Sequence, residues 1–206
     1  MTAAGSLRQA LERAQEAGEA LEAMSFDHED VRNLDLSELT CRRLSLRACR
    51  FTGCDLTGAE LYDCAFLDCQ FTGCRFPVSY WRSCALTGCK ADGGDFRRAR
   101  FKDCALRDCL FRCANFTGGV WERCALTACD LTESALAECR LSRTTLQSLD
   151  LTGAELFRTP FKGVDLTSCT LDRVSLSETC AELKGAKIHA SQAAVVARIL
   201  GIDVIL

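Results

Sequence analysis

Residues 54–76 read CDLTGAELYDCAFLDCQFTGCRF, a stretch with apolar residues on a five-residue period. A bulky side chain recurs at every fifth position, and Cys or Ala stands two places before it. The bulky positions are Leu56, Leu61, Phe66, Phe71 and Phe76. A period of five matches neither the 3.6 residues of a helical turn nor the two-residue repeat of a single strand. The stretch therefore predicts a polygonal coil in which each five-residue unit forms one side.

The same period continues without an insertion from Phe26 to Leu176, which is about thirty units. Every fifth residue over this range is bulky and apolar, except Cys41 and Ala91. Thr-Gly pairs such as Thr57-Gly58 follow many of the bulky residues and supply tight turns between the sides. We expect the coil to close in four units. The bulky side chains then fill the axis, the small ones lie where the backbone turns, and the other positions face water.

Cysteine use supports a buried role for the small positions. The chain has sixteen Cys, and thirteen of them occupy the small position of the repeat. Pairs such as Cys49 and Cys54 have four intervening residues, the upper limit of zinc-site spacing, but they recur evenly with the repeat in place of forming a separate ligand cluster, and the chain has only two His. We therefore expect inert, buried thiols and neither a metal nor a cofactor. Cys113 and Cys180 lie outside the series, and we expect both to be exposed.

Composition and motifs exclude several function classes. The 206 residues are 48% hydrophobic and 26% charged, with a formal net charge of −3, which is typical of a folded domain. We find neither a signal-peptide pattern nor an apolar run of about 18 residues, so we expect a cytoplasmic protein with no membrane partner. No nucleophile stands beside a base, and no glycine-rich phosphate loop occurs. The sequence therefore predicts no catalytic residues and no enzymatic activity.

Several units, such as residues 54–58 (CDLTG), 114–118 (ANFTG) and 154–156 (AEL), resemble the A(D/N)LXX unit of pentapeptide-repeat proteins. The resemblance implies an all-β solenoid, specifically a right-handed quadrilateral parallel β-helix. We divide the chain into an N-terminal capping helix (1–25), the β-helix (26–180) and a C-terminal cap and dimerisation segment (181–206). Pro77 is either a turn residue or the site of a kink in the coil.

Both flanks of the repeat are expected to be helical. Residues Ser6 to Met24 predict an amphipathic helix that covers the first coil, with partner binding as the alternative role. Residues 191–200 predict a second helix, which Gly201 ends, and residues 201–206 alternate like a strand. Apolar segments at the end of a solenoid need a cover, which an intramolecular cap or a second copy of the chain would provide.

Residues 192–206 (QAAVVARILGIDVIL) resemble the C-terminal dimerisation module of the Qnr/MfpA-type pentapeptide-repeat proteins. Those proteins protect DNA gyrase and topoisomerase IV from fluoroquinolones. The resemblance implies a homodimer joined through the C-terminus. The implied interface residues are Ala194, Val195, Val196, Ile199, Leu200, Ile202, Val204, Ile205 and Leu206.

In that family the rod resembles B-form DNA in width and negative charge and occupies the DNA-binding surface of the topoisomerase, without contacting nucleic acid itself. We sorted the outward residues into four sides and found one with seven acids and four bases, the acidic face. The acids of this topoisomerase-binding candidate are Asp35, Glu38, Asp55, Asp95, Glu138, Glu155 and Glu178.

The next side has nine bases and four acids and is called the basic face. Its bases are Arg42, Arg43, Arg82, Arg100, Lys102, Arg123, Arg140, Arg143 and Lys162. Only one side therefore matches DNA in charge, and two other interpretations stay open. In the first, both faces are simply solvated. In the second, the chain is a non-enzymatic interaction scaffold that binds an unrelated partner through the basic face or the N-terminal helix.

Overall fold

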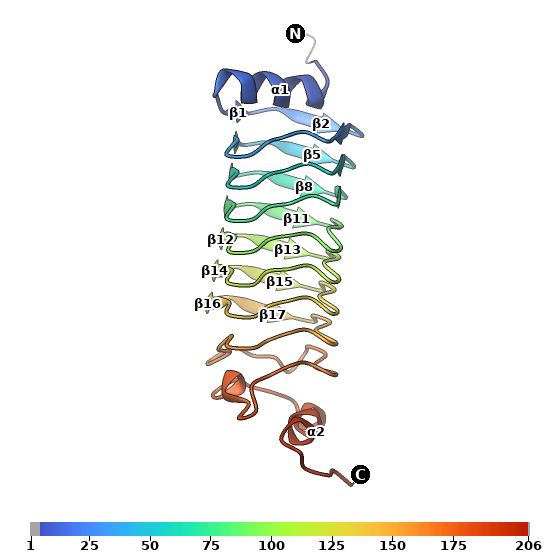
Figure 1. The fold of residues 1–206 in the computed structure, drawn as a ribbon, viewed down its shortest axis with the longest axis vertical. Helices are drawn as coiled ribbons and strands as arrows, with labels where there is room; N and C mark the ends of the chain where they lie inside the picture. The colour runs from blue at the N-terminus through green and yellow to red at the C-terminus, as the bar shows by residue number, and fades with distance from the viewer. Residues whose placement is uncertain (1–4, 206) are drawn as a thin grey trace.

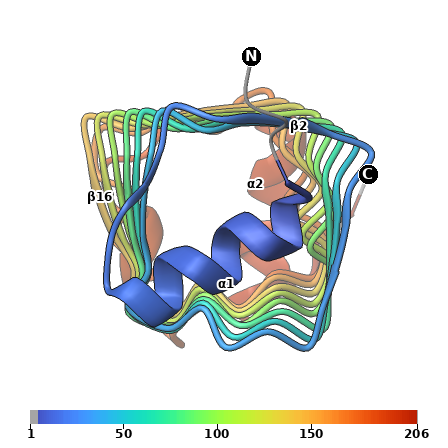
Figure 2. The ribbon, with the colours of Figure 1, turned by 90° about the horizontal axis from the view of Figure 1, so that it is seen from above.

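The computed structural model describes residues 5–205 and shows a rod in which the chain winds through stacked coils. Figure 1 shows the coils along the rod, with helix α1 at one end and α2 near the other. The view along the axis shows their four-sided outline (Figure 2). The fold is the expected right-handed quadrilateral parallel β-helix with a helix at each flank.

The regular elements are short. The helices are α1 (Leu7–Ala17) and α2 (Ala190–Ile199), and a 3₁₀ turn, η1, spans Ala181–Leu183. The strands are β1 (Leu21–Glu22), β2 (Ser25–Asp27), β3 (Asp30–Arg32), β4 (Thr40–Arg42), β5 (Ser45–Arg47), β6 (Arg50–Thr52), β7 (Glu60–Tyr62), β8 (Ala65–Leu67), β9 (Gln70–Thr72), β10 (Tyr80–Arg82), β11 (Ala85–Thr87), β12 (Arg100–Lys102), β13 (Ala105–Arg107), β14 (Val120–Glu122), β15 (Ala125–Thr127), β16 (Arg140–Ser142) and β17 (Thr145–Gln147).

Strand pairing confirms that the coil closes in four units. Leu61 lies opposite Trp81, and Trp81 opposite Phe101, so neighbouring strands are 20 residues apart. Three sides carry the parallel sheets β1-β4-β7-β10-β12-β14-β16, β2-β5-β8-β11-β13-β15-β17 and β3-β6-β9. The fourth side is joined by isolated bridges such as Asp35 to Asp55. Pro77 lies in a turn, and its carbonyl accepts the Gly58 N–H at 2.9 Å, so the coil stays regular there.

The bulky positions stack into columns along the axis. Phe96 lies between Phe76 and Phe116, with ring centroids 4.6 and 4.9 Å apart. Phe101 lies 5.7 Å from Trp81 and 4.1 Å from Trp121 in the next column. Parallel, in-register coils place identical positions directly above one another, so the five-residue period itself builds these stacks. The result is a continuous apolar core with polar side chains outside.

The small positions hold thiols that touch the preceding coil. Cys104 Sγ lies 3.4 Å from the carbonyl oxygen of Trp81, and other thiols of the series make the same contact. Burial raises the pKa of the Cys41 thiol to about 12 and that of Cys139 to about 11, so both stay protonated near neutral pH. All sixteen cysteines lie in the described part of the chain and are free. Cys113 is exposed as expected.

The expectation for Cys180 was wrong, because this side chain is buried. It precedes η1, and the Phe161 N–H donates to the Glu182 carbonyl at 2.8 Å. The chain therefore folds back over the last coils at this point and covers the thiol.

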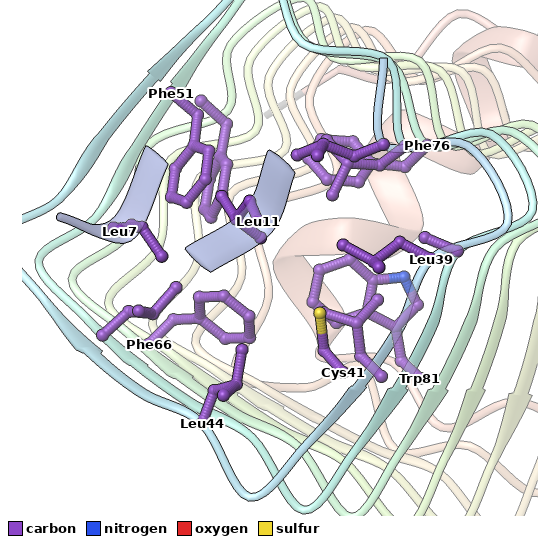
Figure 3. Close-up of a pocket in the computed structure, with 15 residues that line it drawn as sticks. Leu7, Leu11, Leu39, Cys41, Leu44, Phe51, Phe66, Phe76 and Trp81 are labelled. Atoms are coloured by element: carbon purple, nitrogen blue, oxygen red, sulfur yellow. The ribbon is translucent and has the colours of Figure 1, made fainter. Parts of the chain in front are cut away.

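Helix α1 covers the N-terminal coil but is shorter than expected. The Ser6 hydroxyl accepts the Gln9 N–H at the start, and Gly18, with φ 64°, ends the helix. Residues 21–22 already form β1, so the coil begins before residue 26. Leu7 and Leu11 point from α1 into the interior, toward the aromatic side chains of the first coils (Figure 3), around a cavity of about 20 Å³.

The C-terminal segment departs from the repeat by two residues. Asp165 lies opposite Lys187, a separation of 22 residues in place of 20. Helix α2 then begins one residue before the expected 191. The Gln192 side chain attaches α2 to the coil, because its Nε2 donates to the carbonyls of Leu166 (2.8 Å) and Cys169 (2.6 Å).

The strand expected over residues 201–206 is absent from residues 201–205, and Leu206 lies outside the described residues. Alternating apolar residues form a strand only beside a backbone edge that can pair with them, and residues 201–205 make no such pairing within the described chain.

Candidate interaction faces

The acidic face is the side of the rod that is joined by isolated bridges. One row of its outward residues reads Asp35, Asp55, Arg75, Asp95 and Asn115, in register from coil to coil. The row is therefore interrupted by a cation, which lies 3.7 Å from Asp55. Stacked strands are about 4.8 Å apart, so neighbouring charged groups in this row interact electrostatically.

Three of the seven predicted acids have cation partners, namely Asp55, Asp95 and Glu138. The Arg97 guanidinium binds Asp95 at 2.7 Å and holds the pKa of that carboxyl below its usual value. Within residues 5–205 no salt bridge reaches the other four acids, which are Asp35, Glu38, Glu155 and Glu178. These four carboxylates are exposed at the two ends of the face and are free to meet a cationic surface.

Further acids lie on the side of the rod next to the acidic face and at the corner between the two sides. Glu133 has the left-handed backbone of a corner residue, and Asp130 and Asp150 are bridged in register on the neighbouring side. Asp172 follows two coils later. These residues belong to the side that directly precedes the acidic face along the chain, so assigning each residue to one side separated them from it. Asp130 lies 3.9 Å from Arg112, so Glu133, Asp150 and Asp172 are the acids that extend the negative surface in the C-terminal half of the rod.

The basic face is the outer surface of the seven-stranded sheet that contains β1 and β16. Some of its cations are neutralised: Arg43 pairs with Glu22 at 2.6 Å, and Arg123 with Asp103 at 2.6 Å. Glu122 contacts Arg123 and lies 4.0 Å from Lys102 and 3.8 Å from Arg143. Among the described residues, no salt bridge reaches the remaining cations Arg42, Arg82, Arg100, Arg140 and Lys162.

The C-terminal segment presents apolar side chains to solvent. Leu200, Ile202 and Ile205 are exposed to 46%, 54% and 96% of their surfaces. The other predicted interface residues in the described chain are half-buried, namely Ala194, Val195, Val196, Ile199 and Val204. A groove between α2 and the last coil is lined by Asp172, Arg173, Val195, Arg198 and Ile199. These features bring the predicted interface residues together on one end of the rod.

Over residues 5–205, no three His, Cys, Asp or Glu side chains are grouped so that they could hold a metal ion. In the same part of the chain, neither helix combines the length and apolar character that a membrane crossing requires.

Family models match most of the rod. A family model described as a pentapeptide repeat region matches residues 59–127, and a second model, of eight pentapeptide repeats, matches residues 41–76 and 124–163. The chain belongs to the pentapeptide-repeat family. No curated protein matches it in sequence.

Several solved structures are similar to this pentapeptide-repeat protein at low sequence identity. Trypsin-treated QnrB1, a plasmid-mediated fluoroquinolone-resistance protein, is 22% identical, with a TM-score of 0.49 over 91% of this chain and 99% of its own. HetL, involved in heterocyst differentiation regulation in the cyanobacterium Nostoc sp. strain PCC 7120, is 16% identical, with a TM-score of 0.32 over 85% of this chain and 94% of its own. A pentapeptide-repeat protein from the cyanobacterium Cyanothece 51142 is 12% identical, with a TM-score of 0.25 over 89% of this chain and 100% of its own.

Proposed function

We propose that this protein mimics DNA, binds a type II topoisomerase (DNA gyrase or topoisomerase IV), and protects it from a gyrase-targeting antibiotic such as a fluoroquinolone, or inhibits it as the drug does. The observation that carries the proposal is a rod without inserted loops whose acidic face exposes carboxylates, four of them without a cation partner in residues 5–205. The resemblance of residues 192–206 to the Qnr/MfpA-type dimerisation module supports it.

Charge complementarity gives the proposal its physical basis. A protein surface that binds duplex DNA is lined with cations, and such a surface attracts any rigid anionic rod of similar width. The acidic face would meet it through Asp35, Glu38 and Glu155, while the basic face points to solvent or to another partner. Binding by exposed charges weakens as salt screens them, so the complex should dissociate progressively with ionic strength.

The C-terminal segment would complete the DNA-like length. Exposed Leu200, Ile202 and Ile205 offer an apolar contact for a second copy of the chain. Two rods joined end to end span roughly 70 Å at the spacing of stacked strands, which is comparable with about 20 base pairs.

The test is a titration of purified protein into gyrase supercoiling and quinolone-induced DNA cleavage assays. We expect low concentrations to reduce cleavage or restore supercoiling, or higher concentrations to inhibit supercoiling. Unchanged activity of gyrase and of topoisomerase IV up to a large excess would reject the proposal.

Charge-reversal variants assign the surface. The change of Asp55, Asp95 and Glu155 to Lys should abolish gyrase binding. The matched control changes Asp27, Asp68 and Asp108 to Lys, at the end of β2 and directly after β8 and β13, and this variant should bind like the wild type. Circular dichroism checks that both variants fold. Equal loss in both would show that net charge, and not the acidic face, governs binding.

A further inference from the structure

The basic face contains two tyrosines that the core does not need. Tyr62 lies between Arg42 and Arg82 in one outward row, and Lys102 follows Arg82 in the same row. In the second outward row of this sheet, Tyr80 lies next to Arg100. We call these six residues the basic-aromatic patch. They come from four adjacent strands, β4, β7, β10 and β12, and therefore lie on one continuous sheet surface.

The two rings lie against each other and against a cation. Tyr62 and Tyr80 have ring centroids 5.7 Å apart at an interplanar angle of 69°, and the Arg42 guanidinium carbon lies 4.6 Å from the Tyr62 ring centre. The Tyr62 hydroxyl donates to Glu60 at 2.9 Å, which fixes the ring on the sheet. Both tyrosines are half-buried, so each ring keeps an accessible part.

The cations around the rings are largely free. Within residues 5–205 no salt bridge reaches Arg82 or Arg100, and both are exposed. Asp103 and Glu122 are both bound by Arg123, and Glu122 also lies 4.0 Å from Lys102. Glu60 accepts the Tyr62 hydroxyl but keeps its charge, and Asp63 is exposed; within residues 5–205 no salt bridge reaches either acid, so the four cations of the patch outnumber them. The patch therefore keeps a positive charge although the whole chain has a net charge of −3.

A flat sheet with outward aromatic rings among cations suits single-stranded nucleic acid. Unstacked bases lie on the rings, and phosphates contact the neighbouring cations, an arrangement that duplex DNA with its stacked bases cannot use. We propose that the basic-aromatic patch binds single-stranded nucleic acid. This activity goes beyond the proposed function, in which the partner is a protein and the acidic face makes the contact.

Fluorescence anisotropy of a labelled oligothymidine of about 16 nucleotides tests the proposal on the full chain. We expect saturable binding that is at least fivefold tighter than binding to a duplex of the same length. With about three phosphate contacts, affinity should fall roughly twentyfold between 50 and 200 mM salt. No binding at about 100 µM protein and low salt, or equal affinity for duplex and single strand, overturns the proposal.

Variants separate charge from stacking. Changing Arg82 and Arg100 to Glu should weaken binding at least tenfold, whereas Arg47 and Arg107 changed to Glu, exposed on the neighbouring sheet, should leave it within twofold. Tyr80→Leu should weaken oligothymidine binding at least fivefold, because it removes a stacking surface and keeps the charge. An unchanged affinity in either patch variant contradicts the proposal.

Two controls identify the partner and keep this inference separate from topoisomerase binding. The first control is poly-glutamate. If it displaces the oligonucleotide, binds as tightly, and binds the Tyr80→Leu variant as well as the wild type, the patch recognises an acidic protein. The nucleic-acid assignment is then wrong. The acidic-face variant of Asp55, Asp95 and Glu155 should bind oligothymidine at least as well as the wild type. The gyrase assays above therefore can fail while this binding persists, and the reverse also holds.

Discussion

At the scale of single residues, the two core tryptophans differ by one neighbouring hydroxyl. Trp81 Nε1 donates to Ser79 Oγ at 2.9 Å, and that hydroxyl donates to the Phe76 carbonyl at 2.6 Å. Gly119 stands at the equivalent position before Trp121, whose indole N–H is buried and has no hydrogen-bond partner among the described residues. A buried donor without a partner costs more than a bond contributes when it is made.

We expect Ser79→Ala to lower the free energy of unfolding by about 1–3 kcal/mol, because it leaves the Trp81 N–H buried without an acceptor. Urea denaturation followed by circular dichroism measures this change. Ser134→Ala is the control, since Ser134 is buried at the same repeat position and donates to the Leu131 carbonyl at 2.7 Å, but serves no indole. The control should cost only about 0.5–1.5 kcal/mol. Equal losses would show that the Trp81 N–H does not set the cost.

At the scale of elements, one carboxylate completes the last regular turn of the coil. A corner N–H normally donates to the carbonyl 19 residues later, as Glu138 does to Phe157 at 2.8 Å. The Arg158 N–H has no such partner because the chain leaves the coil there, and Glu182 Oε1 accepts it at 2.9 Å. Burial acts to raise the pKa of Glu182, but hydrogen bonds from Arg158 and Ser177 outweigh it and hold the pKa below its usual value.

This depressed pKa predicts the pH dependence of the C-terminal cap. A carboxyl whose pKa is lower in the folded state stabilises above its unfolded pKa, near 4.5, and loses that contribution as pH falls through the folded value. Glu182→Gln should therefore reduce stability by about 1–3 kcal/mol at pH 7, and its difference from the wild type should shrink below about pH 4.5. Urea denaturation across pH measures both; Glu178→Gln, at an exposed position, should behave as wild type. A constant difference across pH would contradict the assignment.

The same cap shows where sequence reasoning ends. The five-residue period predicted the coil, its four sides and which positions face outward in the regular coils, because every unit repeats the same local packing. The apolar register slips from Leu176 to Leu183 and Ile188 in the sequence, which already indicates the two-residue shift at Lys187. The role of Glu182 could not be predicted, since it depends on where the preceding coil leaves its N–H groups. Alternation over residues 201–206 predicted a strand that residues 201–205 do not form, because that pattern does not reveal whether a partner edge exists. The pairing of Arg97 with Asp95 likewise depends on side-chain geometry.

At the scale of the whole molecule, the two flanks of the rod differ in what they expose. Helix α1 buries Leu7 and Leu11 against the first coils, whereas Leu200, Ile202 and Ile205 are exposed after α2. A rod that is apolar at both ends would associate head to tail without closure. A rod with one such end can form an isologous pair that closes on itself.

We therefore expect a dimer, and not a filament, joined through the segment after α2. Changing Ile202 and Ile205 to Asp should convert it to a monomer, because the pair would have to bury four unpaired carboxylates. Sedimentation velocity over a range of concentrations measures the change. Leu67→Asp is the matched control, since Leu67 is 39% exposed on β8 in the middle of the rod, and it should leave the dimer intact. A wild-type chain that stays monomeric at all concentrations, or a variant that still dimerises, would show that this segment is an intramolecular cap.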